Sequence, residues 1–571
     1  MVASQAAGTD AAPGLDDALR ARAASWLAQD PDGETRGELR ALLAAADEGD
    51  PAAAASLTDR FSTRLAFGTA GLRGRLGAGS NRMNRVLVGQ AAAGFAAYLR
   101  EKAGADDTPT VVIGYDGRRN SDVFARDSAE IFAGAGLRVI LLPRLLPTPV
   151  LAFAVRYFDA AAGVMVTASH NPPDDNGYKV YLGGADGGSQ IVAPADAEIA
   201  AHIQRVADEG DLAAIPRSLA YATAPEAVID EYVAATAAVA PAGPGADGFS
   251  WVYTAMHGVG WQTFARVLGD AGYPLPTLVE AQTEPDGAFP TVSFPNPEEP
   301  GAMDLAFETA RAAGAELVVA NDPDADRLAV AIPDAAAEGG WRRLSGNQVG
   351  LLLGWRAARL AAGTDGASLA CSLVSSPGLA AVAEHYGLDF HATLTGFKWI
   401  SRAPGMVFGF EEALGYLVNP ETVRDKDGIS AAVAILGLAT DAREEGRSLV
   451  DLLDEFDATF GSFASDQIAV RVDDVSTIAR IMGALRTEHP AAIGDVAVER
   501  IDDLLAGVDG LPPGDVLRLW LTDGSRVLVR PSGTEPKLKL YLDVRGDSPD
   551  DARARIAALA AGARTLLDAL D

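Results

Sequence analysis

The stretch GVMVTASHNPPDDNGYK, residues 163–179, places a short apolar run directly before a polar turn rich in Pro, Asn and Gly. The run has the β-branched, apolar composition of a buried strand, and the turn residues end it. Ligands bind open α/β sheets at the carboxyl ends of the strands, which is where Ser169 would lie. The stretch therefore predicts an α/β sheet with a functional loop at one edge.

Comparable apolar runs recur on both sides of this stretch, with helical segments between them. Strands that alternate with helices are typical of α/β units. We therefore expect three stretches of α/β units with largely parallel sheets. The predicted strands are Thr110–Tyr115, Leu137–Leu142, Gly163–Thr167, Trp251–Ala255, Glu316–Ala320, Ala367–Val374 and Met406–Phe410.

The two ends of the chain differ from its middle. Residues 14–60 carry apolar residues at helical spacing, such as Leu19, Ala23 and Trp26, and indicate a helical extension. The last part combines predicted strands at 466–472, 516–521, 526–529 and 537–544 with helices at 475–487 and 549–569, which predicts a small α+β domain. The predicted divisions of the chain are 1–60, 61–215, 216–340, 341–462 and 463–571.

Composition limits the partners of this chain. Its 571 residues carry 47 basic and 78 acidic side chains, a net charge of −31, which repels nucleic acid and anionic membranes. The single cysteine, Cys371, excludes an intramolecular disulfide framework. No apolar run is long enough to span a membrane, and residues 1–14 lack the features of a secretory signal. We expect a cytoplasmic protein without a nucleic-acid or membrane partner; its oligomeric state is left open.

Ser169 is the first candidate for chemistry. A serine can carry a phosphoryl group covalently and so divide one difficult transfer into two easier ones. His170 and Lys179 in the same stretch would supply proton transfer or charge neutralisation. The alternative is a turn serine that bonds its own backbone. A Gly-x-Ser-x-Gly elbow is absent, so a serine hydrolase has little support.

The second candidate is Asn-Asp322-Pro-Asp324-Ala-Asp326-Arg327, directly after the predicted strand Glu316–Ala320. Carboxylates two residues apart in an extended segment point to one side, and three of them repel one another unless a cation is bound. Oxygen ligands favour Mg²⁺ or Ca²⁺. An EF-hand would need Gly at 327 and Glu at 333, where Arg and Pro stand. A solvated acidic loop remains the alternative.

The third candidate is the segment Arg530-Pro-Ser532-Gly533-Thr534-Glu-Pro-Lys537, between two predicted strands. Arg presents a planar fork to phosphate, and hydroxyl and backbone N–H groups complete a cradle. A plain turn is the alternative. Two weaker signals are the glycine-lined loop around Arg73 and the segments with Lys398 and the pair Glu411 and Glu412, whose carboxylates suit sugar hydroxyls.

Together these segments resemble the α-D-phosphohexomutases, the family that includes phosphoglucomutase and phosphomannomutase. The Arg73 loop, the Ser169 segment, the aspartate triad, the Glu411–Glu412 loop and the Arg530 segment occur in the family's order. The resemblance covers the chain after about residue 60, and the helical extension is similar to that of a longer branch of the family. It implies four domains around a central cleft: three similar α/β domains with mixed, largely parallel sheets, and a smaller C-terminal α+β domain.

The resemblance also implies the roles of the residues. Ser169 would be the phosphoserine, and Asp322, Asp324 and Asp326 would bind Mg²⁺ together with a phosphate oxygen on Ser169. The transfer site would include Arg73, His170, Lys179 and Lys398. Sugar phosphate would contact Arg327, Glu411, Glu412, Arg530, Ser532, Gly533, Thr534 and Lys537. In these terms 61–215 is the phosphoserine domain, 216–340 the metal-binding domain, 341–462 the sugar-binding domain and 463–571 the phosphate-binding domain.

The reaction implied is the interconversion of hexose 1-phosphate and hexose 6-phosphate through a hexose 1,6-bisphosphate, which also acts as activator. Ala413 departs from the family, because many hexose-specific members have serine there. The preferred sugar, glucose or mannose, therefore stays open, and a phosphopentomutase or a glucose 1,6-bisphosphate synthase is the alternative. A phosphatase using the same serine and a sensor without catalysis are further rivals.

Overall fold

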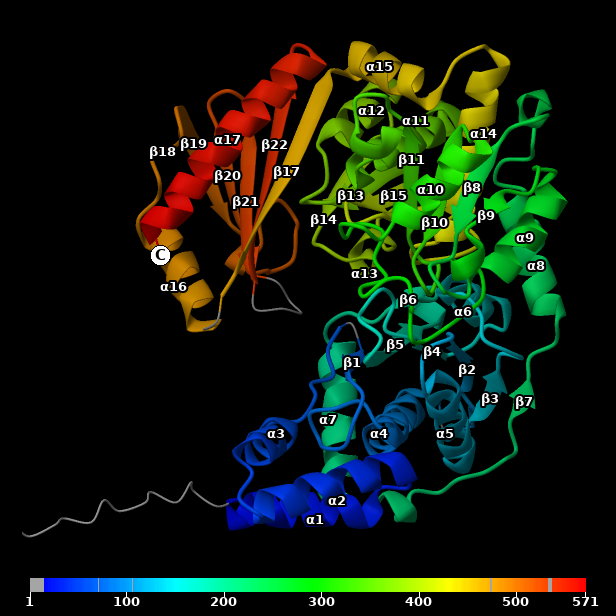
Figure 1. Cartoon of the computed structure of the whole chain (residues 1–571), viewed down its shortest axis with the longest axis vertical. Coiled ribbons are helices and arrows are strands. Elements are labelled where there is room, and N and C mark those ends of the chain that lie inside the picture. The colour runs from blue at the N-terminus through cyan, green and yellow to red at the C-terminus, as the bar shows by residue number, and fades with distance from the viewer. Residues whose placement is uncertain (1–14, 70, 105, 473–474, 532–536, 571) are drawn as a thin grey trace, which may run out of the picture.

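The computed structural model describes residues 15–69, 71–104, 106–472, 475–531 and 537–570. The predicted residues Ser532, Gly533 and Thr534 lie outside these ranges. Figure 1 shows the first domain at one end of the molecule, the second and third domains together above it, and the fourth beside the third.

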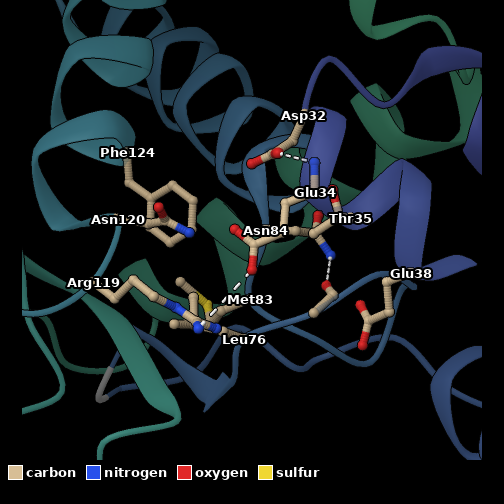
Figure 2. Close-up of a pocket in the computed structure, with 11 residues that line it drawn as sticks. Asp32, Glu34, Thr35, Glu38, Leu76, Met83, Asn84, Arg119, Asn120 and Phe124 are labelled. Atoms are coloured by element: carbon tan, nitrogen blue, oxygen red, sulfur yellow. Dashed lines mark hydrogen bonds and ion pairs between the residues drawn. The ribbon is translucent and has the colours of Figure 1, made fainter. Parts of the chain in front are cut away.

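The N-terminal extension consists of three helices, α1 (Asp17–Gln29), α2 (Gly33–Asp47) and α3 (Pro51–Phe61). Each begins after an aspartate whose carboxylate accepts a backbone N–H of the first turn, the pattern expected of an N-cap. Glu38 in α2 accepts hydrogen bonds from Arg60 (2.6 Å) and from the backbone N–H of Ala78 (2.8 Å) and so joins the extension to the first domain. A cavity of about 190 Å³ lies at this junction, and Arg119 and Asn84 line its domain side (Figure 2).

The first sheet has the strand order β1-β5-β4-β2-β3-β7, with β6 paired to β5. Strands β2, β3, β4 and β7 are parallel, and β5 runs antiparallel to β4, β1 and β6. Its strands are β1 (Leu72–Arg75), β2 (Thr110–Tyr115), β3 (Arg138–Leu141), β4 (Ala162–Val166), β5 (Asp175–Leu182), β6 (Ser189–Gln190) and β7 (Ala222–Thr223). Its helices are α4 (Arg85–Lys102), α5 (Ser121–Gly134), α6 (Thr148–Tyr157) and α7 (Ala195–Glu209).

The second and third sheets repeat the central part of the first. The second contains β8 (Trp251–Thr254), β9 (Thr277–Leu278), β10 (Leu317–Asn321), β11 (Leu328–Pro333) and β12 (Trp341–Arg343), with α8 (Ala227–Ala237), α9 (Gly260–Ala271) and α10 (Asp304–Ala313). The third contains β13 (Ser368–Ser372), β14 (Asp389–Thr393), β15 (Met406–Glu411) and β16 (Gly415–Leu417). Its helices are α11 (Gly346–Ala361), α12 (Gly378–Tyr386), α13 (Phe397–Ile400), α14 (Gly428–Glu444) and α15 (Leu449–Phe460).

The orders β5-β4-β2-β3, β11-β10-β8-β9 and β16-β15-β13-β14 are the same arrangement three times. The central strands β4, β10 and β15 pair in parallel with the earlier strands β2, β8 and β13, respectively. Each of them also pairs antiparallel with the next strand of the chain, β5, β11 or β16. The loops β4–β5, β10–β11 and β15–β16 therefore occupy equivalent positions in the three sheets. These loops carry Ser169, the aspartate triad and Glu412.

The fourth sheet is antiparallel throughout, in the order β17-β22-β21-β20-β19-β18. Its strands are β17 (Ser462–Arg471), β18 (Ala492–Ile493), β19 (Val496–Asp503), β20 (Leu517–Leu521), β21 (Arg526–Pro531) and β22 (Lys537–Gly546). Helices α16 (Val475–Thr487) and α17 (Pro549–Leu570) share one apolar core with the sheet. The predicted α/β class with mixed sheets and a C-terminal α+β domain is confirmed, whereas the exact domain limits stay a prediction.

A small apolar cluster joins the third and fourth domains. Leu373 and Val374, just after β13, pack with Leu504 and Val516 of the fourth domain. Arg526 also donates a hydrogen bond to the backbone carbonyl of Ser375. No helix among the described residues is long and apolar enough to cross a membrane.

Candidate active site

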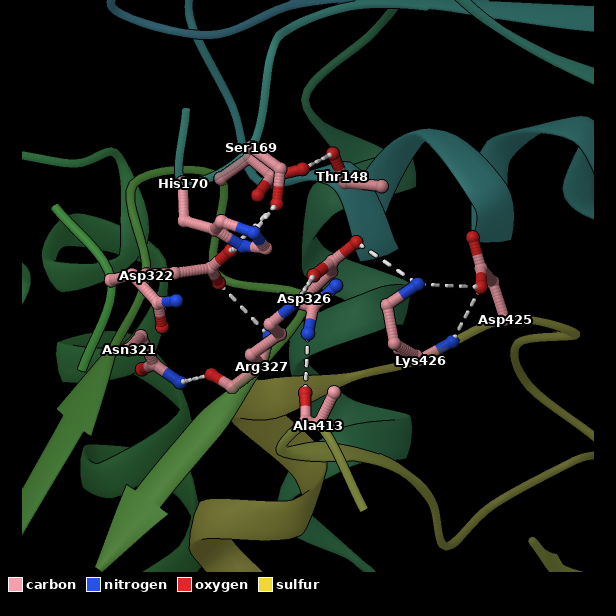
Figure 3. Close-up of polar contacts among 12 residues, drawn as sticks. Thr148, Ser169, His170, Asn321, Asp322, Asp326, Arg327, Ala413, Asp425 and Lys426 are labelled. Carbon is pink, nitrogen blue, oxygen red and sulfur yellow. Dashed lines mark hydrogen bonds and ion pairs between the residues drawn. The ribbon is translucent and has the colours of Figure 1, made fainter. Parts of the chain in front are cut away.

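The aspartate loop of the second domain contacts the Ser169 loop of the first domain and the β15–β16 loop of the third (Figure 3). The Ser169 hydroxyl lies 2.8 Å from Oδ2 of Asp322, although 153 positions separate the two residues in the chain. Arg327 of the aspartate loop donates a hydrogen bond to the backbone carbonyl of Ala413 in the β15–β16 loop. The repeated topology thus brings the Ser169, aspartate and Glu412 loops to one point.

The Ser169 loop is held in an unusual backbone conformation. Ser169 itself is buried and has a φ of 51°, in the left-handed region that costs a residue with a side chain about 1–3 kcal/mol. The hydroxyl of Thr167 accepts a hydrogen bond from the Ser169 N–H at 2.8 Å. The Arg118 guanidinium donates to four carbonyls of the loop, those of Ser169 (2.6 Å), Asn171 (2.5 Å), Pro172 (2.9 Å) and Asp175 (3.1 Å).

The predicted aspartate triad forms one compact cluster. Asp322, Asp324 and Asp326 are fully buried, and each offers an oxygen that lies within 4.8 Å of the oxygens of the other two. Lys179 donates to Asp324 at 2.7 Å and to Asp326 at 2.8 Å. Thr148, at the start of α6, donates to the same oxygen of Asp324 at 2.6 Å.

Two oxygens of this triad are left for a ligand. Oδ1 of Asp324 and Oδ1 of Asp326 are buried and accept no hydrogen bond from any described residue. A buried acceptor without a partner is costly, and a divalent cation with oxygen ligands would satisfy both. The donor set therefore fits Mg²⁺, as predicted for this loop, and a solvated acidic loop is excluded by its burial.

The charges of the site have clear physical causes. Burial, together with the nearby Arg327 and Arg73, holds the pKa of His170 well below its usual value. Burial would lower the pKa of Lys179, but Asp324 and Asp326 outweigh it and raise that pKa. Lys179 is therefore a fixed cation, whereas His170 is neutral near pH 7. The Nδ1 atom of His170 lies 3.4 Å from Oγ of Ser169.

The third domain contributes two different glutamates. The Glu412 carboxylate accepts hydrogen bonds from Ser372 (3.1 Å) and Ser375 (2.9 Å), so it is tied to the end of β13. Burial and the charge of Glu411 raise the pKa of Glu412 to about 7. Because Glu412 is tied to Ser372 and Ser375, Glu411 is the better placed of the two for a substrate. Lys398, at the start of α13, donates to the hydroxyl of Thr69 in the first domain.

A groove of about 300 Å³ runs between the third and fourth domains. Lys398, Thr395 and Trp399 line one side of it, and Arg530 lines the other. Arg530 ends β21, while Lys537 begins β22 on the far side of the segment that is not described. Arg73 on β1 donates to the side chain of Asn171 at 3.2 Å and so lies beside the Ser169 loop.

Comparison with known proteins agrees with this arrangement. Four consecutive matches are to the α/β/α domains I, II and III and the C-terminal domain of phosphoglucomutase/phosphomannomutase, at residues 64–209, 230–336, 345–459 and 468–561. The chain belongs to the phosphoglucomutase/phosphomannomutase family. This confirms the predicted family and fold class, and with them the predicted enzyme class, an intramolecular phosphotransferase acting on a hexose phosphate.

Individual relatives match this chain over more than four fifths of its length. A protein of Haemophilus influenzae named as a probable phosphomannomutase is 54% identical over 85% of this chain and 98% of its own. A phosphoglucomutase of Staphylococcus epidermidis is 34% identical, over 86% and 92% of the two chains. The crystal structure of a phosphoglucomutase/phosphomannomutase family protein of Burkholderia thailandensis shares the fold, with a TM-score of 0.68 at 21% identity over 89% and 98%.

Three further residues belong to this site and were missed from the sequence: Arg118, Thr148 and Lys426, whose ammonium group lies 3.3 Å from Oδ2 of Asp326. Arg118 follows shortly after the buried strand β2, a position where charged residues are a recognisable signal. Lys426 stands just before Asp427, the N-cap of an apolar helix, and was hidden by that ordinary capping pattern. Thr148 gave no signal beyond a helix start.

Proposed function

We propose that this member of the family interconverts hexose 1-phosphate and hexose 6-phosphate by carrying a phosphoryl group on Ser169. The observation that carries the proposal is the 2.8 Å contact between the Ser169 hydroxyl and Asp322, beside two buried carboxylate oxygens without hydrogen bonds. A serine in that position can hold a phosphate against a cation bound by the triad.

The residues of the first two domains would perform the transfer. The bond from phosphorus to Oγ of Ser169 breaks while a bond to the free sugar hydroxyl forms, and the hydroxyl proton passes by way of His170 to the serine oxygen. Lys179 and Arg73 offset negative charge around the phosphoryl oxygens. Mg²⁺, when bound by Asp322, Asp324 and Asp326, would supply further stabilisation of that charge.

The third and fourth domains would hold the part of the substrate that does not react. Glu411 would bind sugar hydroxyls, with Glu412 and Arg327 keeping its loop in place, and Lys398 would contact the substrate from the opposite side. The distal phosphate would bind at Arg530 and Lys537 with Ser532, Gly533 and Thr534. A hexose 1,6-bisphosphate would be the intermediate, which turns over so that its second phosphate faces Ser169.

The test compares Ser169→Ala with Ser62→Ala, a change at an exposed serine after α3. We expect the wild-type protein and the Ser62→Ala protein to carry one phosphate, found by mass spectrometry on the peptide that contains Ser169. Ser169→Ala should lose this phosphate and at least about 10⁴-fold in kcat with glucose 1-phosphate, since loss of a nucleophile removes the covalent route. Wild-type turnover by Ser169→Ala would contradict the proposal.

A phosphopentomutase is the second candidate, because relatives named phosphoribomutase and phosphopentomutase match this chain over 94% and 93% of its length at 34% and 33% identity. Rates on glucose, mannose and ribose phosphates, each with a trace of the matching bisphosphate, would rank the substrates. A product that accumulates as bisphosphate in stoichiometric amounts would indicate a synthase instead. A cytoplasmic location is also part of the proposal.

A further inference from the structure

The segment 425–428 connects all three α/β domains directly behind the aspartate triad. Asp425 accepts hydrogen bonds from Tyr181 and Gln190 of the first domain, both at 2.8 Å. The Nζ atom of the next residue, Lys426, lies 3.3 Å from Oδ2 of Asp326 in the second domain (Figure 3). Asp427 then caps α14 of the third domain. Consecutive side chains thus reach the first domain, the triad and the third domain.

Lys426 has little freedom to leave this place. Only 8% of its surface is exposed, and its ammonium group lies 5.3 Å from the centre of the Phe397 ring. Its stem packs so closely on Gly415 that a Cβ at that glycine would lie 2.5 Å from Cδ of Lys426. The positive charge is therefore fixed beside the triad by packing as well as by the ion pair.

Two carboxylates share that charge. Lys426 lies 3.3 Å from Asp326 and 3.5 Å from Asp425, while Asp326 already receives a hydrogen bond from Lys179. A cation bound at the triad would be repelled by both ammonium groups. Asp425, held by Tyr181, partly neutralises Lys426 and so reduces this repulsion.

We propose that Lys426 is a positioning residue that weakens divalent-cation binding at the aspartate triad, and that Asp425 adjusts this effect through its contacts with the first domain. The inference rests on the proposed Mg²⁺ site. It links the contact between the first and third domains to the affinity of the metal, so that a cation is held firmly only when Asp425 is anchored.

The test is a calorimetric titration of Mg²⁺ into the metal-free full chain, with phosphate on Ser169 matched between samples by mass spectrometry. Lys426→Met should bind Mg²⁺ about tenfold more tightly, because one unit of positive charge is removed from beside the site. Asp425→Asn keeps the shape of the side chain but removes the negative charge that partly neutralises Lys426. It should therefore weaken Mg²⁺ binding about threefold. The melting temperature in EDTA should fall for both variants.

The two variants should change the affinity for Mg²⁺ in opposite directions. A merely structural role of Lys426 and Asp425 would instead weaken Mg²⁺ binding in both variants. Lys102→Met removes a charge from an exposed surface pair with Glu198 and should leave the Kd for Mg²⁺ unchanged. Unchanged or weaker binding by Lys426→Met would overturn the lysine proposal. If that variant does not fold, unchanged or tighter binding by Asp425→Asn overturns it. A wild-type protein that binds no Mg²⁺ would overturn the proposed metal site as well.

Discussion

Ser169 keeps its left-handed backbone because one buried guanidinium satisfies the carbonyls around it. Asp116 holds the backbone of Arg118, because its Oδ1 accepts the backbone N–H of Arg118 at 3.0 Å, and the Arg118 guanidinium lies 4.8 Å from the centre of the Phe289 ring of the second domain. The Arg118 guanidinium, which acts as a clamp on the Ser169 loop, therefore connects the end of β2, this loop and the neighbouring domain. The short motif around Ser169 predicts a candidate nucleophile, but it does not predict Arg118, which holds the loop of that serine.

Replacing this clamp should impair the chemical step more than substrate binding. In Arg118→Lys a point charge replaces a fork that serves four carbonyls, so the loop loses its fixed geometry. We expect kcat to fall about 100-fold with KM changed by less than about threefold, since small misplacements of reacting groups are costly. Steady-state kinetics together with rapid-quench transfer of phosphate from the phosphoprotein to sugar would measure both effects.

The neighbouring Arg119 provides a matched control for that prediction. Its side chain is 56% exposed and lies 4.0 Å from Glu34 in α2. Arg119→Lys should therefore retain the wild-type kcat. An equal loss in both variants, or a loss in Arg118→Lys confined to KM, would show that the guanidinium does not position Ser169.

At the scale of elements, the decisive feature is the loop that follows the same central strand in each of the first three sheets. The sequence predicts β4, β10 and β15, because short apolar runs precede polar turns, but it does not predict their antiparallel partners β5 and β11. Strand β11, LAVAIP, is a continuous apolar run whose periodicity does not separate a buried strand from a helix. The meeting of Lys179 with Asp324, 145 positions away, is likewise visible only in three dimensions.

The β15–β16 loop carries a buried acid that should make stability depend on pH. Burial and Glu411 raise the pKa of Glu412 from 4.5 to about 7, so the folded protein binds a proton that the unfolded chain releases. The raised pKa adds at most about 3 kcal/mol to the free energy of unfolding. This contribution is fully present below about pH 4.5 and is lost as pH rises through 7. Glu412→Gln should therefore melt several degrees above the wild type at pH 8.

The same comparison at low pH tests the cause. Near pH 4.5 the difference in melting temperature between Glu412→Gln and the wild type should vanish, because the wild-type carboxyl is then protonated in the folded state. Glu384→Gln, a change at an exposed glutamate of α12, should track the wild type at every pH. A Glu412→Gln effect that is independent of pH would mean that the carboxyl does not titrate in this range.

At the scale of the whole molecule, the net charge of −31 would repel phosphorylated metabolites, so anion binding would depend on cations that different domains bring together. Composition predicts that such a local cluster must exist, and the motifs supply Arg73, Lys179, Lys398 and Arg530. The relative placement of the domains could not be predicted, because it rests on contacts such as Leu504 with Leu373 that no local pattern marks.

The contact between the third and fourth domains should control substrate affinity. Leu504 is fully buried in the cluster with Leu373 and Val374, and Arg530 lines the groove beside it. Leu504→Ala should cost about 2–4 kcal/mol of local stability. It should also raise KM several-fold with little change in kcat, because the distal phosphate site loses its fixed distance from Ser169 while the transfer residues stay in place.

Leu485→Ala separates this effect from a simple loss of stability in the fourth domain. Leu485 is 3% exposed and packs within that domain, between α16 and the sheet, away from the third domain. Hydrogen exchange should show a similar loss of protection over residues 475–531 and 537–546 in both variants, but only Leu504→Ala should raise KM. If Leu485→Ala raised KM as much as Leu504→Ala, stability of the fourth domain alone would account for substrate affinity. The Leu504 contact would then not be what fixes the distance between the distal phosphate site and Ser169.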